Sequence, residues 1–301
     1  MRQTDVTGIV ERLAAEVRER YVFPDVAEAI ATLLADRLAA GAYAAATDLT
    51  ALCELVTADL QAVNNDRHLR LKHHEIEIDE HAADAAEADL RRQADASLNG
   101  VTRVEHLDGG AVHVELRPLL FPPEWAAHAV IAAMNLAAPA TALFLDVRHT
   151  VGGDPRMVAL LCSYLFDEPT HLTTIVERGG DDARQSWTLP YVPGPRFGAS
   201  KPVYVLTSAA TFSGGEELAY DLQQLGRATV VGERTGGGAH PRIGVRLHPH
   251  LEATIPVARP VHPVSGGDWE GVGVRPDVEV KAEDALAAAH RLATNGKPVA
   301  A

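Results

Sequence analysis

Apolar residues recur every three or four positions over roughly the first 65 residues. This spacing predicts three amphipathic helices. The three runs are Ile9, Leu13 and Val17; Ala27, Ile30, Leu33, Leu34 and Leu38; and Leu49, Leu52, Leu55, Val56, Leu60 and Val63. Helix start and stop signals agree with these runs. Pro24 precedes the second run, Gly41 follows it, and Asn64-Asn65 follows the third. The pattern predicts a small helical N-terminal domain over residues 1–74.

The next segment is acidic and rich in alanine. Residues 75–96 read EIEIDEHAADAAEADLRRQADA. Charge runs of this kind usually form solvated helix faces. We therefore expect a linker helix within residues 75–100 and not a binding surface.

The hydrophobic period changes after Gly100. Residues 101–106 and 111–116 alternate around Asp108-Gly109-Gly110, which predicts a β-hairpin. Short apolar runs of the buried-strand type then alternate with helical patterns, which is typical of a mainly parallel sheet covered by helices. The predicted strands are 142–147, 203–207, 228–231 and 278–280, and the predicted helices are 125–138, 155–166, 213–225 and 282–292. We expect an α/β core over residues 101–301.

Charge and composition exclude several classes of protein. The net charge of −14 and the lack of a Lys/Arg stripe argue against nucleic acid as a partner. No stretch reaches 18 apolar residues, so no membrane span is expected. The N-terminus lacks a signal-peptide pattern, and we expect a cytoplasmic protein, although a chain without its leader would look the same. Cys53 and Cys162 fit small buried apolar residues better than a disulfide.

Ser213 stands where the helix predicted over 213–225 begins. With Glu216 three positions later, S-G-G-E fits a capping box, in which each side chain satisfies a backbone donor. The same position would place a hydroxyl beside free N–H groups and the positive end of the helix dipole, which could stabilise an oxyanion. The sequence leaves both interpretations of Ser213 open.

A second motif follows the strand predicted over 142–147. It places Gly152-Gly153 at the carboxyl end of that strand, where open α/β sheets usually hold ligands. The alternative is a plain glycine-rich turn. Together with a serine at a helix start, backbone donors here would form half of an acyl-transfer site.

Other local signals carry little weight. Neither His73-His74 nor the pair His248 and His250 has a carboxylate or cysteine set at ligand spacing, so no metal site is predicted. The segment GERTGGGAH lacks the Lys-Ser/Thr ending of a phosphate loop and is expected to line a cleft. No cofactor is predicted.

Two long segments carry a family resemblance. DVRHTVGGDPRMVALLCSYLF and KPVYVLTSAATFSGGEELAYDLQQLGRATVVGERTGGGAHP resemble the serine peptidase family of C-terminal processing (tail-specific) proteases, tricorn proteases and the repeats of interphotoreceptor retinoid-binding protein. The segments RYVFPDVAEAIATLLADRLAAGAY, NNDRHLRL and GGDWEGVGVRPDVEV resemble the retinoid-binding-protein branch, so the resemblance covers nearly the whole chain. It implies a ClpP/crotonase-like α/β core behind the small helical domain.

The resemblance implies a set of site residues. The nucleophile of the family falls on Ser213, and the oxyanion donors fall on the backbone of Gly214 and of Gly152 or Gly153. The processing-protease branch uses a lysine base 25 residues after the serine, but Gly238 stands there. A Ser/Lys dyad is therefore excluded at that position.

The tricorn branch supplies the remaining two residues. Its histidine base falls on His68, and its acidic residue falls on Glu270 in EGVGVRPD. A Ser-His-Glu set is chemically coherent, because an imidazole can take the hydroxyl proton and a carboxylate can fix its tautomer. Asp66 is an alternative acid, since it lies closer to His68 in sequence.

The chain also departs from the family pattern. His149, Thr150 and Val151 replace the usual asparagine and third glycine, which could reshape the oxyanion pocket, and Arg67 replaces the serine before the tricorn histidine. His149 and His240 are spare candidates for the base. No peptide-binding insertion of the PDZ type is visible, which makes long protein substrates less expected.

These features favour a serine peptidase that forms an acyl-enzyme on a peptide or small acyl substrate. One alternative is a binding protein for a hydrophobic small molecule, as the retinoid-binding repeats are. Another is a biosynthetic enzyme that reuses the site on a small substrate. Self-association into a homo-oligomer is a further expectation, which rests on analogy with the family alone.

Overall fold

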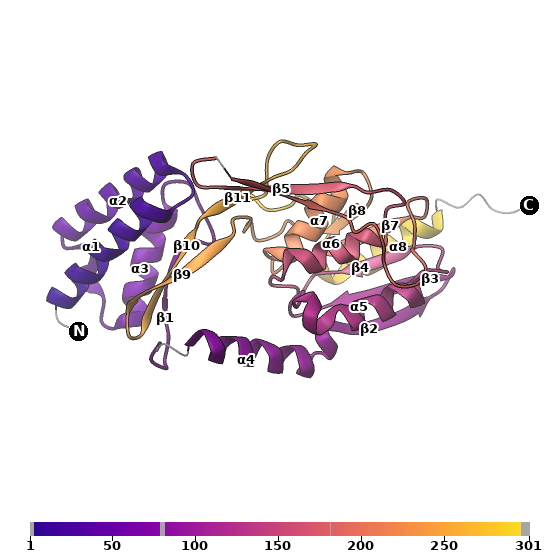
Figure 1. The fold of residues 1–301 in the computed structure, drawn as a ribbon, viewed down its shortest axis with the longest axis horizontal. Coiled ribbons are helices and arrows are strands. Elements are labelled where there is room, and N and C mark those ends of the chain that lie inside the picture. Colours follow the sequence, from indigo (N-terminus) through magenta and orange to yellow (C-terminus); the bar gives the residue numbers. More distant parts are fainter. Residues whose placement is uncertain (1–2, 79–81, 181, 296–301) are drawn as a thin grey trace, which may run out of the picture. The chain divides into compact units, whose positions relative to one another are not determined.

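The chain folds into two compact units (Figure 1). This is a computed structural model, and it describes residues 3–78, 82–180 and 182–295. The first unit comprises Met1–Glu87, Ile175–Arg184 and Gly238–Val261. The second comprises Ala88–Thr174, Gln185–Gly237 and His262–Ala301. Each unit is therefore assembled from segments that are far apart in sequence.

The first unit combines three helices with a small antiparallel sheet. The helical elements are α1 (Gln3–Arg20), α2 (Pro24–Ala39), the short η1 (Ala42–Ala45) and α3 (Leu49–Gln61). The sheet has the order β1-β10-β9, from β1 (Arg70–His73), β10 (Leu251–Pro256) and β9 (Arg242–His248). Leu13 and Leu34 of the helices share one buried apolar cluster with Leu251 and Ile255 of the sheet. The three predicted helices are confirmed, whereas this sheet was not predicted.

The second unit contains a six-stranded sheet with the order β12-β8-β7-β4-β3-β2. Its strands are β2 (Val101–Leu107), β3 (Ala111–Leu116), β4 (Leu143–Asp146), β7 (Val203–Thr207), β8 (Thr229–Gly232) and β12 (Val278–Glu279). β2 and β3 form the predicted antiparallel hairpin, and every other neighbouring pair is parallel. The predicted α/β class is confirmed.

Helices cover this sheet. They are α5 (Pro123–Ala137), α6 (Pro155–Ser163), α7 (Gly214–Gln224) and α8 (Ala285–Asn295), with η3 (Ala282–Asp284) directly before α8. Of these, α5, α7 and α8 contact the strands of the sheet, and α6 packs against α5 and α7. Phe144 and Leu206 share a buried cluster with Ala289 of α8. Side chains alternate along a strand, so Leu145 points to the opposite face. The closing helix predicted over 282–292 is thus a 3-10 turn followed by an α-helix.

The remaining elements complete the chain. The acidic segment forms α4 (Ala82–Ala96) and η2 (Leu98–Gly100), so its helix begins later than predicted; positions 79–81 lie outside the described residues. A third sheet has the order β11-β5-β6, from β11 (Ala258–Val261), β5 (His171–Glu177) and β6 (Ala183–Trp187), and the unit boundary falls within β5 and β6.

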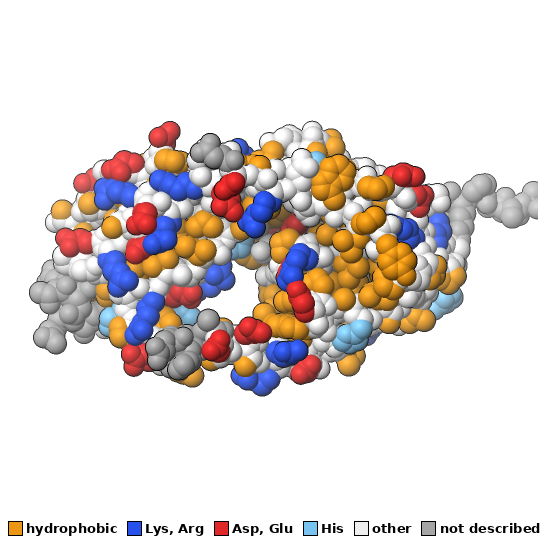
Figure 2. All heavy atoms as spheres, viewed as in Figure 1, with side chains coloured by type: hydrophobic (Ala, Val, Ile, Leu, Met, Phe, Trp, Pro, Cys, Tyr) orange, Lys and Arg blue, Asp and Glu red, His pale blue; other side chains and the backbone are white. Residues whose placement is uncertain are grey.

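The surface and the cysteines agree with the expectations from composition. On the face drawn in Figure 2, acidic and basic side chains lie interspersed. Cys53 and Cys162 are both buried free thiols. No helix among the described residues is long and apolar enough to cross a bilayer.

Candidate active site

Ser213 lies in the turn between β7 and α7, and its backbone conformation is unusual. Its φ is +51° and its ψ is −119°. A non-glycine residue pays about 1–3 kcal/mol for such a conformation. An ordinary N-cap residue is extended, with negative φ, so capping alone does not require this geometry. A strained serine in a strand-to-helix turn is the arrangement that exposes a nucleophile in other α/β enzymes.

Two glycines of the loop after β4 lie against this turn. A Cβ built on Gly214 would lie 2.9 Å from the backbone nitrogen of Gly153. A Cβ built on Gly152 would lie 3.6 Å from Cβ of Ser213. Gly152 and Gly153 also have φ of 152° and 155°, values that side-chain-bearing residues rarely adopt. The predicted oxyanion residues therefore lie close to the turn that carries the predicted nucleophile.

Backbone donors are available at this contact. Within residues 3–78, 82–180 and 182–295, the N–H groups of Gly152, Gly153 and Gly214 have no hydrogen-bond acceptor. Buried N–H groups normally find a partner. Three such donors in the segments that meet at Ser213 are the kind of group that binds a developing oxyanion.

Hydrogen bonds join the loop after β4 to the loop after β7. The Phe212 N–H donates to the Thr150 carbonyl at 3.0 Å. The Thr211 hydroxyl donates to the Val147 carbonyl at 2.8 Å, and the Ser208 hydroxyl donates to the Arg148 carbonyl at 2.5 Å. These bonds fix the glycine loop relative to Ser213. We call the two bonded segments, residues 147–153 and 208–213, the loop junction.

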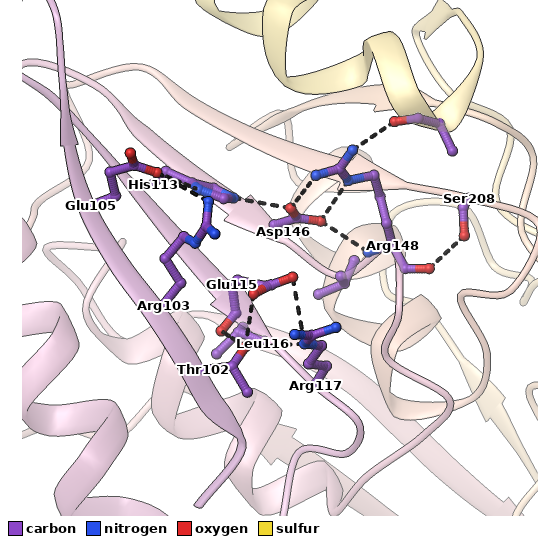
Figure 3. Close-up of polar contacts among 12 residues, drawn as sticks. Thr102, Arg103, Glu105, His113, Glu115, Leu116, Arg117, Asp146, Arg148 and Ser208 are labelled. Carbon is purple, nitrogen blue, oxygen red and sulfur yellow. Dashed lines mark hydrogen bonds and ion pairs between the residues drawn. The ribbon is translucent and has the colours of Figure 1, made fainter. Parts of the chain in front are cut away.

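A buried ion pair supports the loop junction from the end of β4 (Figure 3). The guanidinium of Arg148 donates to both oxygens of Asp146, at 2.9 and 2.6 Å. Nε2 of His113 lies 2.9 Å from the same carboxylate, and Arg148 also donates to the Ala282 carbonyl. Burial alone raises the pKa of Asp146, but the hydrogen bonds from Arg148 and His113 outweigh burial and hold that pKa well below its usual range. Asp146 is therefore a firmly ionised anchor.

The body of α7 contains a second group of buried acids. Burial, with a smaller contribution from Asp154, raises the pKa of Glu217 to about 8. Burial, together with the nearby Glu217, raises the pKa of Asp221 well above its usual value. Neither side-chain oxygen of Asp221 has a hydrogen-bond partner among the described residues. This pair is therefore held largely in its neutral form near neutral pH.

In the first unit, Asp66 organises a polar network. Its Oδ2 accepts a hydrogen bond from the Tyr21 hydroxyl at 2.8 Å and lies 2.7 Å from Nδ1 of His240. Its Oδ1 accepts the backbone N–H of His68 at 3.0 Å. Burial alone raises the pKa of Asp66, but the bonds from His240, Tyr21 and His68 lower it on balance. The ring of His240 and the backbone N–H of His68 therefore share the Asp66 carboxylate.

His68 belongs to the first unit and is 9% exposed. Its carbonyl accepts a hydrogen bond from the Thr254 hydroxyl at 2.6 Å, so β10 as well as Asp66 fixes its backbone. The position is thus rigidly held. Of the other candidate bases, His149 is exposed and His240 is buried beside Asp66.

Glu270 belongs to the second unit, as Ser213 does. The adjacent Trp269 is buried, and its ring packs on Tyr220 of α7 with centroids 5.1 Å apart. The backbone N–H of Glu270 donates to Asp268 Oδ1 at 2.8 Å. The segment that carries the predicted acid is therefore packed on the helix that directly follows the predicted nucleophile.

Two family profiles match the chain. That of peptidase family S41 matches residues 124–280. That of the N-terminal domain of peptidase S41 in eukaryotic IRBP matches residues 2–99. The first match alone covers more than half of the chain, and it includes Ser213, the Gly152-Gly153 loop and the glycines of GERTGGGAH.

Solved structures share the fold. A protein from Parabacteroides merdae has a TM-score of 0.64 at 18% identity, over 97% of this chain and 97% of that one. The tricorn protease has a TM-score of 0.59 at 13% identity, over 97% of this chain and 37% of that one. The photosystem II D1 C-terminal processing protease has a TM-score of 0.52 at 17% identity, over 93% and 94% of the two chains.

Proposed function

The chain belongs to peptidase family S41 and is a serine-type peptidase by that membership, and we propose that it forms an acyl-enzyme on Ser213. One observation carries the proposal. Ser213 has a strained conformation at a helix start, next to Gly152 and Gly214, and the N–H groups of Gly152, Gly153 and Gly214 have no acceptor among the described residues. A capping residue needs neither the strain nor these donors.

The chemistry follows the usual course of acyl transfer. Oγ of Ser213 attacks the substrate carbonyl carbon while a base removes the hydroxyl proton. The carbonyl oxygen becomes an oxyanion, which the three glycine N–H groups bind. The proton then passes to the leaving amine, and the C–N bond breaks. Water hydrolyses the resulting ester and regenerates the free hydroxyl.

We assign the base to His68 and the orienting acid to Glu270. A histidine can accept the proton from Ser213 and later donate it to the leaving group near neutral pH. A carboxylate on the other ring nitrogen fixes the tautomer and stabilises the imidazolium. His240 is the rival base, because its Nδ1 already lies 2.7 Å from a carboxylate oxygen of Asp66. The substrate class is a peptide or a small acyl compound.

Labelling with a fluorophosphonate probe tests the nucleophile and the base together. We expect the native protein to react and Ser213→Ala to remain unlabelled. His68→Ala should react at least about 100-fold more slowly, since general base catalysis contributes roughly that much. His128→Ala is the matched control, because His128 is an exposed histidine outside the site, and it should react as the native protein does.

Each other outcome has a defined meaning. Labelling that survives Ser213→Ala would place the nucleophile elsewhere. Loss of labelling in His240→Ala but not in His68→Ala would move the base to the Asp66–His240 pair. A native protein that takes no label but binds a hydrophobic small molecule tightly would be a carrier and not a peptidase.

A further inference from the structure

Glu216 makes more contacts than a capping residue needs. Its side chain is fully buried, and Oε2 accepts the Ser213 N–H at 2.8 Å, which is the carboxylate half of the predicted capping box. Oε1 accepts two further bonds, from the Thr235 hydroxyl at 2.5 Å and from the Gly237 N–H at 2.7 Å. The carboxylate therefore joins the nucleophile turn to a loop about twenty residues further along the chain.

That loop is itself bound to the turn that follows Glu270. The Val274 N–H donates to the Thr235 hydroxyl oxygen at 2.7 Å, and the Gly271 N–H donates to the Gly237 carbonyl at 2.9 Å. A Cβ on Gly273 would lie 2.2 Å from the Thr235 carbonyl oxygen, so this contact is close. All of these residues belong to the second unit.

The hydrogen-bond directions around Glu216 are determined. A backbone N–H only donates, so Ser213 and Gly237 must both donate to the carboxylate. The Thr235 oxygen accepts from Val274, which leaves its own proton for Oε1. Both carboxylate oxygens accept hydrogen bonds in these three contacts, which suits an ionised side chain. Its position in the first turn of α7 also places this negative charge at the positive end of the helix dipole.

We propose that Glu216 is the positioning residue of the nucleophile: it holds Ser213 in its strained conformation and ties it to the Gly271–Val274 turn. A charge-assisted bond to the Ser213 N–H restrains the backbone directly next to the strained torsion. Through Thr235 and Gly237, the same carboxylate also fixes the position of the segment that follows Glu270. This role rests on the proposed function, because a serine that does no chemistry would not need to be positioned.

Glu216→Gln is the sharpest variant, because it preserves size and shape. A glutamine amide has one acceptor oxygen and one NH2 donor. In one orientation the NH2 group would face the N–H donor of Ser213. In the other it would face the donors of Thr235 and Gly237. We expect the rate of fluorophosphonate labelling to fall about 10- to 100-fold. In other enzymes, a displacement of a catalytic group by about 1 Å lowers the rate by a similar factor. The maximal rate should fall while half-saturation by the probe stays unchanged.

Two further variants separate positioning from general damage. Thr235→Val removes the hydroxyl and should slow labelling about 10-fold, whereas Thr235→Ser keeps it and should restore the rate to within about twofold. Glu217→Gln is the matched control. It alters the next buried acid of the same helix, whose side chain makes no bond to Ser213, and it keeps the bond from the Glu217 backbone N–H to the Ser213 carbonyl. It should label at the native rate.

Amide hydrogen exchange supplies a readout that does not depend on activity. Glu216→Gln should speed exchange in peptides that cover residues 209–217 and 233–238, and Glu217→Gln should not. Native labelling in a folded Glu216→Gln, or unchanged exchange in both peptides, would overturn the positioning role. A native protein that takes no label would overturn the proposed function. The exchange data would still decide whether Glu216 ties the Ser213 turn to the loop at Thr235 and Gly237.

Discussion

Two pairs of buried acids in the second unit have opposite surroundings: Asp146 and Glu216, which flank the loop junction, and Glu217 and Asp221, which lie further along α7. Asp146 accepts two hydrogen bonds from the Arg148 guanidinium. Glu216 accepts hydrogen bonds from the backbone N–H groups of Ser213 and Gly237. Asp221 is equally buried, but neither of its oxygens has a partner within the described residues. An ion without partners is costly to bury, whereas a paired ion is costly to disturb. Loss of a charged partner should therefore destabilise the acids that flank the loop junction, whereas replacing an acid further along α7 with a neutral amide should stabilise the protein at alkaline pH.

The largest expected effect on stability is that of Arg148→Met. It leaves the buried Asp146 carboxylate with His113 as its remaining side-chain partner, and it should lower the free energy of unfolding by about 3–5 kcal/mol. Urea unfolding at pH 7 measures this. Because the folded-state pKa of Asp146 lies below the unfolded value, its stabilisation is present above about pH 4 and is lost as pH falls. The gap between the native protein and the variant should therefore narrow in acid. A loss below about 1 kcal/mol at pH 7 would mean that the pair contributes no more than a surface ion pair.

Gly214→Ala should affect activity more than stability. The added Cβ would meet the backbone nitrogen of Gly153 at 2.9 Å and displace a proposed oxyanion donor. We expect labelling to slow about 10- to 1000-fold, in the range seen when one such donor is lost. Gly8→Ala is the matched control, because its Cβ would meet nothing within 4 Å. Native labelling of Gly214→Ala would remove the glycine contact from the mechanism.

The smallest and opposite effect is expected in the helix body, from Glu217→Gln. The folded protein keeps a proton on Glu217 up to about pH 8, whereas the unfolded chain releases it near the ordinary value of 4.5. The free energy of unfolding therefore falls as pH rises through this window, by up to about 1.4 kcal/mol per pH unit. Glu217→Gln should flatten this slope and gain stability relative to the native protein at pH 8. Urea unfolding at pH 5 and at pH 8 measures the change in the free energy of unfolding between these pH values. If this change were the same in the native protein and in the variant, Glu217 would not be held neutral.

Sequence patterns predicted the helices and the parallel strands of the core well, because these elements bury one face or both. The strands of the other two sheets were missed, namely β1, β9 and β10 in the first unit and β5, β6 and β11 in the third sheet. Most residues of β9 are exposed or half-buried, so no alternation of apolar residues marks the strand. The joining of residues 238–261 to the N-terminal helices also depends on pairing with β1, which is remote in sequence.

The candidate site shows the same division. The motif S-G-G-E identified Ser213 as a helix start, and the family resemblance identified it as a nucleophile, but only the coordinates show its positive φ. Glu216 was predicted as a capping partner from its spacing. Its second oxygen accepts hydrogen bonds from Thr235 and Gly237. A local sequence pattern does not predict hydrogen bonds between residues about twenty positions apart. The bond between Asp66 and His240 spans an even longer separation.

Mass spectrometry of the fluorophosphonate-treated protein would locate the reactive residue directly. After proteolysis, the account predicts that the probe mass resides on Ser213 in the native protein and that the corresponding peptide of Ser213→Ala is unmodified. A modified residue elsewhere in the chain, or an unmodified Ser213 in folded protein at high probe concentration, would contradict the assignment of Ser213 as the nucleophile.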